Sequence, residues 1–113
     1  MAKYCAVENV FDAQLKGIIT EDYLLVADVR LDAELTKLGF KPADITLPNP
    51  LLTQIAVFMA METCCLGEAQ GEDSQLLKKA DGYKAQYQPL LDSLVLDGLG
   101  VEGGADDVYF AAI

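Results

Sequence analysis

One segment, Leu51–Leu66, constrains the fold of this chain more than any other, because it is apolar nearly all round. Asn49 and Pro50 before it form a strong helix start: Asn caps the helix, and Pro at the first helical position loses no needed hydrogen bond. Gly67 is expected to end the helix. A helix without a polar face is the buried centre of a fold or a subunit contact. At about 16 residues it is shorter than the roughly 20 that span a bilayer, so we expect a soluble protein.

Helical periodicity continues on both sides of this segment. Before it, the spacing predicts a short helix over 7–15 and a longer one over 21–38, the latter between a Thr20 N-cap and a Gly39 C-cap. After it, a polar acidic loop leads to a long helix that begins at Asp73 or Ser74.

Pro89 interrupts this last helix, so we expect either a kink near Ala85 or a break into two helices. The predicted fold is therefore all-α: residues 1–97 form a small bundle of about four helices, and residues 98–113 form a flexible tail rich in Gly and acidic residues.

The tail ends in an apolar run, which is unusual for a segment in water. Two interpretations are open: the tail folds back onto the helices or is simply disordered, or its tip binds a partner. The residues expected to make partner contacts are Val108, Tyr109, Phe110 and Ile113.

Composition excludes several functional classes. The 113 residues suit one domain, and 18 acidic against 8 basic side chains give a formal charge of −10. Nucleic-acid and anionic-membrane binding need clustered Lys and Arg, so neither is expected. The chain contains no His, which removes the commonest general base and zinc ligand. We expect no enzyme activity, no cofactor and no metal.

Two groups of reactive side chains need a separate interpretation. Cys64 and Cys65 are adjacent, and Cys5 makes the number of cysteines odd, so buried small residues explain them better than disulfides or a redox pair. Asp28 and Asp32 share a helix face and could hold Mg²⁺ or Ca²⁺ weakly, but a solvated helix face explains them better.

The order of the elements resembles that of a known family. A short start, Tyr4–Val10, leads into a Thr20-Glu21 helix and then a proline-bearing linker. The run Pro48–Ala60 follows, with Leu-Leu-x-x-Ile-Ala-x-x-x-Ala from position 51, and then a helix with spaced tyrosines over 83–87. This layout is similar to that of the small head–tail connector proteins (adaptor or head-completion proteins) of tailed bacteriophages and prophages.

The resemblance implies a structural role in the virion, with assembly in the host cytoplasm. Such subunits form a ring beneath the portal, extend the DNA channel and offer a docking surface to the tail. The implied partners are portal and tail-completion proteins and further copies of the chain, without sequence-specific DNA binding. The free chain could be monomeric.

Two other classes remain open. The first is a bacterial interaction module or small regulator unrelated to phage, which would bind through an exposed face of the third helix at Phe58 and Met61. The second is a redox protein or enzyme that uses Cys64 and Cys65.

Overall fold

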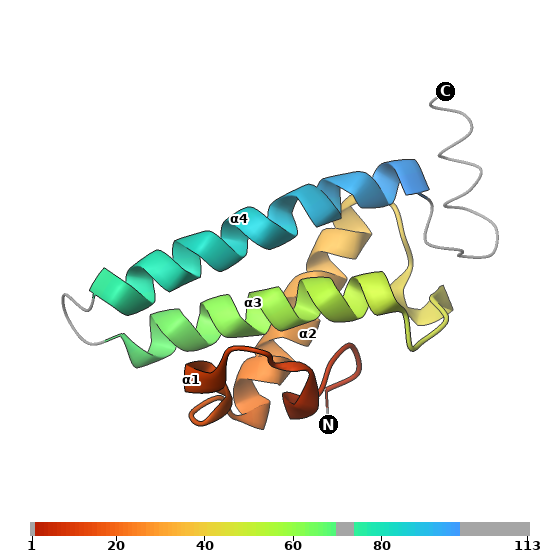
Figure 1. Cartoon of the computed structure of the whole chain (residues 1–113). Helices are drawn as coiled ribbons and strands as arrows, with labels where there is room; N and C mark the ends of the chain where they lie inside the picture. The colour runs from red at the N-terminus through yellow and green to blue at the C-terminus, as the bar shows by residue number, and fades with distance from the viewer. Residues whose placement is uncertain (1, 70–73, 98–113) are drawn as a thin grey trace.

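Helix α3 (Pro50–Glu68) forms the centre of the molecule in the computed structural model, which describes residues 2–69 and 74–97 (Figure 1). The Asn49 side chain accepts hydrogen bonds from the backbone N–H groups of Leu51 and Leu52, at 3.0 and 3.1 Å, as the predicted cap requires. The helix continues past Gly67 to Glu68, so the predicted end is two residues too early.

Most of α3 is buried, as its composition predicts. Helix α2 (Glu21–Lys37) crosses it on one side, and α4 (Ser74–Asp97) runs antiparallel along it (Figure 1). With 19 residues, α3 is long and apolar enough to cross a membrane, so its length does not argue against a span. The most apolar 18-residue stretch of α3 is 61% buried inside the molecule, and this burial identifies α3 as a core helix.

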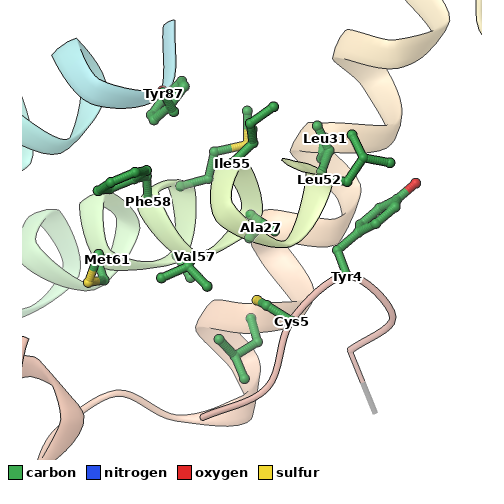
Figure 2. Packing of buried hydrophobic residues seen from close by; sticks show 14 of the residues in the cluster. Tyr4, Cys5, Ala27, Leu31, Leu52, Ile55, Val57, Phe58, Met61 and Tyr87 are labelled. Atoms are coloured by element: carbon green, nitrogen blue, oxygen red, sulfur yellow. The ribbon is translucent and has the colours of Figure 1, made fainter. Parts of the chain in front are cut away.

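The core is assembled on α3 from three directions (Figure 2). Ala27 and Leu31 reach it from α2, Tyr87 reaches it from α4, and Tyr4 and Cys5 reach it from the N-terminal segment. The buried residues of α3 itself are Leu52, Ile55, Ala56, Val57, Phe58, Met59, Ala60, Met61, Glu62, Cys64 and Cys65.

Helix α2 confirms its predicted bounds to within a residue. Thr20 stands at the N-cap position, but its side chain makes no capping hydrogen bond. Gly39 follows the helix with a φ of 95°, a left-handed conformation that favours glycine.

The single helix predicted over 7–15 is wrong. Two short elements replace it: the 3₁₀ helix η1 (Val7–Asn9) and the one-turn helix α1 (Ala13–Lys16). Asp12 causes the restart, because its carboxylate accepts the N–H groups of Gln14 and Leu15 and so caps a new helix. The linker before α3 contains another 3₁₀ turn, η2 (Pro42–Asp44), and a cis Leu47–Pro48 bond.

Helix α4 is continuous through Pro89, so the predicted alternative of two helices is wrong. Proline removes one backbone hydrogen bond, and the buried side chains of Tyr87, Leu91 and Leu94 hold the helix on the core on both sides of it. The described residues form a small all-α bundle, as predicted. The predicted flexible tail over 98–113 lies outside the described residues.

Candidate functional site

The tyrosines of the described ranges bond to carboxylates. Each hydroxyl donates a hydrogen bond to an Asp or Glu on a different element. Burial together with this bond raises the pKa of Tyr4, Tyr83 and Tyr87, whereas for Tyr23 the bond to Glu68 is the main cause of the raised pKa. These bonds between tyrosines and carboxylates therefore connect different parts of the bundle. The pairs are Tyr4–Asp32, Tyr23–Glu68 (2.6 Å), Tyr83–Asp12 and Tyr87–Glu62 (2.8 Å).

The most buried polar cluster joins all three long helices. The Arg30 guanidinium on α2 lies 2.9 Å from the buried Glu62 carboxylate on α3. It also donates to Thr63 at 2.9 Å and to the Tyr87 hydroxyl on α4 at 2.8 Å. Burial, followed by the bond to Glu62, raises the pKa of Tyr87 to about 12. Every member of the cluster has a hydrogen-bond or ion-pair partner within it. The cluster therefore holds the three helices in one arrangement.

A second cluster fixes α1 to α4. Lys79 donates to Asp12 at 2.9 Å and to Gln14 at 2.7 Å, and Tyr83 also donates to Asp12. Burial opposes ionisation of Asp12, but the bonds from Tyr83 and Lys79 outweigh it and lower its pKa to about 2. Such a carboxylate stays ionised at neutral pH and is a poor proton acceptor.

The three cysteines are buried and free. Burial raises the pKa of Cys5 to about 12 and that of Cys64 to about 11, and it raises the pKa of Cys65 as well. The reactive form is the thiolate, which these shifts suppress at neutral pH. The prediction of small buried residues on α3 is confirmed for Cys64 and Cys65.

The acidic pair on α2 is not a solvated face, and that prediction is wrong for Asp28. Its buried carboxylate accepts the backbone N–H groups of Lys3 at 2.8 Å and Tyr4 at 3.3 Å. Asp32 accepts the Lys3 ammonium at 2.8 Å. Both acids thereby hold the N-terminal segment on α2. Within residues 2–69 and 74–97, no group of three metal-ligating side chains comes together.

The structure places Phe58 and Met61 in the core, where they are 8% and 0% exposed. The predicted exposed face of α3 at these positions is therefore wrong. Phe58 packs edge-on against Phe11, with ring centroids 5.6 Å apart, and also contacts Tyr83 at 6.0 Å. The reason is that α3 is covered by the N-terminal connection as well as by two helices, which its apolar circumference requires.

An exposed apolar surface lies on α2 instead. Leu25, Val26 and Val29 are all exposed, and Val29 is 69% exposed. Their spacing of three and four residues puts them on one helix face, opposite the buried Leu24 and Leu31. We call these three residues the α2 ridge. Leu25 and Val29 lie four residues apart and outside the core-facing positions of α2, and this spacing was a sequence signal for the ridge that the prediction of α2 did not include.

A shallow groove lies at the start of α3, with a volume of about 460 Å³. Pro48 and Pro50 line it, together with Thr53, Gln54 and Val57 on the first turns of α3. Asn9, the last residue of η1, and Phe11, from the connection between η1 and α1, complete the lining. Phe11 is 64% exposed, and none of the lining residues carries a charge.

No protein-family model, curated protein or solved structure matches this chain. Of the predicted partner-binding residues, Val108, Tyr109, Phe110 and Ile113 lie outside the described residues. Among the described residues, the α2 ridge and the groove are thus two surfaces with the composition of a binding site.

Proposed function

We propose that this chain is a structural subunit, a head–tail connector that joins the portal of a phage or prophage capsid to the tail. The observation that carries the proposal is the α2 ridge. Three large apolar side chains exposed side by side on a chain of charge −10 are what a subunit contact requires.

The polar chemistry of the bundle agrees with a structural role. The buried Glu62 and Asp28 carboxylates and the described tyrosines are all engaged in bonds between elements. Such networks fix one arrangement of helices, which a subunit needs in order to present the same surface to each neighbour.

The net charge suits a ring around DNA. Acidic subunits arranged in a ring present a negative channel that repels phosphates, so the duplex slides without sticking. The same repulsion keeps free subunits apart until contacts with the portal and the ridge outweigh it. In this proposal the tail tip, with Val108, Tyr109, Phe110 and Ile113, contacts the portal.

The test combines recovery of partners with complementation. The tagged full chain is pulled down from the source cells during prophage induction, and its partners are identified by mass spectrometry. Portal and tail-completion proteins in near-stoichiometric amounts support the proposal. Recovery of only host regulatory or metabolic proteins, while particles are being made, contradicts it and favours an interaction module unrelated to phage.

A charge placed on the ridge tests the subunit contact. In cells whose own copy is deleted, Val29→Glu is expected to leave heads and tails unjoined, because it puts a carboxylate into an apolar contact. Gln86→Glu adds the same charge at an exposed position of α4 and is expected to restore joined particles. If both variants restored joined particles equally, the α2 ridge would not be the subunit contact.

A further inference from the structure

We propose that the groove at the start of α3 is the docking site for the apolar tip of the same chain, residues 108–113. The proposal concerns the free subunit and holds whether or not the chain is a phage connector. It is carried by the chemistry of the groove, by the chemistry of the tip and by the place where the chain leaves the bundle.

The groove and the tip match in polarity. None of the residues that line the groove is charged, and the tip, Val-Tyr-Phe-Ala-Ala-Ile, contains no charged side chain. At about 460 Å³ the groove is in the size range of sites that take a few side chains. Thr53 and Gln54 add a hydroxyl and an amide that suit the backbone of an extended segment.

Phe11 gives the groove a preference for aromatic side chains. Its ring is fixed edge-on against the buried Phe58, yet it remains mostly exposed and lines the groove. An exposed ring held in place offers a surface for edge-to-face or offset packing of a second ring. The tip supplies two aromatic residues, Tyr109 and Phe110.

The end of α4 and the groove lie at the same end of the bundle. Helix α4 ends at Asp97, at the end of the bundle where α3 begins (Figure 1), and Pro48 and Pro50 line the groove there. The ten residues 98–107 span up to about 33 Å when extended. A glycine-rich coil of ten residues has an average end-to-end distance of about 17 Å.

A short tether favours the tip of the same chain over that of another copy. Linkers of this kind give effective concentrations of the order of millimolar, whereas free subunits meet at the concentration of the protein. Own-chain docking also covers the exposed Phe11 and removes an apolar segment from water. We therefore assign the groove to the subunit's own tip.

Photo-cross-linking of the full chain tests this assignment. Phe110 is replaced by p-benzoylphenylalanine, and the links formed under light are mapped by mass spectrometry in an equal mixture of isotope-labelled and unlabelled chains. We expect links to Phe11 or to residues 48–57, with both halves from the same isotopic population. Links to the α2 ridge, links between populations or no links overturn the proposal.

A substitution that fills the groove gives a second test, with a matched control on α4. Thr53→Trp occupies the groove and is expected to reduce the yield of these links about tenfold, because it builds a clash against the tip. Gln86→Trp adds the same side chain at an exposed position of α4 and is expected to leave the yield unchanged. Equal yields from the two variants overturn the proposal.

Methyl NMR gives a second readout that needs no photoreactive group. Val57 lines the groove and Val29 lies on the ridge, so their methyl signals serve as reporter and control. Phe110→Ser is expected to shift the Val57 methyl signals, because a ring leaves their neighbourhood, and to leave those of Val29 in place. Unchanged Val57 signals contradict docking in the groove.

Discussion

At the scale of single residues, several acidic side chains among the described residues act as hydrogen-bond acceptors between elements, Asp12, Asp28, Asp32, Glu62 and Glu68 among them. Asp28 illustrates what sequence could not provide: its position on a polar helix face was evident, but its partners, the N–H groups of Lys3 and Tyr4, lie 25 and 24 residues away. Nothing in the local pattern indicates a bond to backbone so distant. The buried cysteines on α3, in contrast, followed directly from their apolar neighbours.

The bond between Arg30 and Glu62 gives a prediction at this scale. Arg30→Met leaves the buried Glu62 carboxylate without its cation, and we expect a loss of about 2 kcal/mol in the free energy of unfolding, since part of Arg30 is exposed to water. The double variant Arg30→Met with Glu62→Met removes both charges and is expected to cost about 1 kcal/mol or less.

Urea denaturation of the wild type, both single variants and the double variant measures these values as a thermodynamic cycle. A double variant less stable than Arg30→Met alone would show that Glu62 stabilises the bundle even without Arg30, through the bond that it accepts from Tyr87, and would contradict the expectation that the unpaired charge is the main cost.

At the scale of elements, the helices differed in how well sequence predicted them. α2 and α3 were predicted nearly at their observed bounds, because each has a strong apolar pattern and a recognisable start. The first helix failed because its apolar spacing continued across Asp12, whose capping bonds divide it. The groove was not predictable, since it forms where a linker, a short turn and α3 meet.

Two glycines inside helices give opposite predictions. A Cβ at Gly82 would meet open space, so Gly82→Ala is expected to stabilise the protein by about 0.5–1 kcal/mol through helix propensity. A Cβ at Gly67 would lie 2.7 Å from the Tyr23 hydroxyl oxygen, which is bonded to Glu68. Gly67→Ala is therefore expected to destabilise by about 1 kcal/mol despite its better propensity.

Thermal and urea unfolding measure both changes, and removal of the neighbouring ring provides the control. In a Tyr23→Ala background, Gly67→Ala is expected to stabilise by about 1 kcal/mol, as at any open helix position. If Gly67→Ala stabilised the wild type as much as Gly82→Ala does, the close approach of Tyr23 would not explain the glycine at position 67.

At the scale of the whole molecule, bonds from tyrosines to carboxylates connect the N-terminal segment, α1, α2, α3 and α4. Burial and these bonds raise the phenol pKa values above the ordinary value of 10, to about 12 for Tyr87. A folded pKa above the unfolded one contributes stability that is fully present below pH 10. That stability is lost as the pH rises from 10 towards 12 and beyond.

Absorbance at 295 nm reports tyrosinate clearly because the chain contains five Tyr and no Trp. We expect the native protein to ionise most of its tyrosines well above pH 10, together with the loss of helical circular dichroism. The same chain in guanidinium chloride is expected to ionise near pH 10. Superimposable native and denatured curves would contradict the bonding described for the tyrosines.

The bond between Asp12 and Tyr83 has a consequence for the order of events during synthesis. The two residues are 71 positions apart, so a growing chain exposes Asp12 long before its partners on α4 exist. Contacts of such long range carry a closure entropy that local helix contacts do not, and they slow folding relative to bundles with neighbouring contacts. The local capping bonds of Asp12 can form early in synthesis, but its bonds from Lys79 and Tyr83 can form only after α4 has left the ribosome.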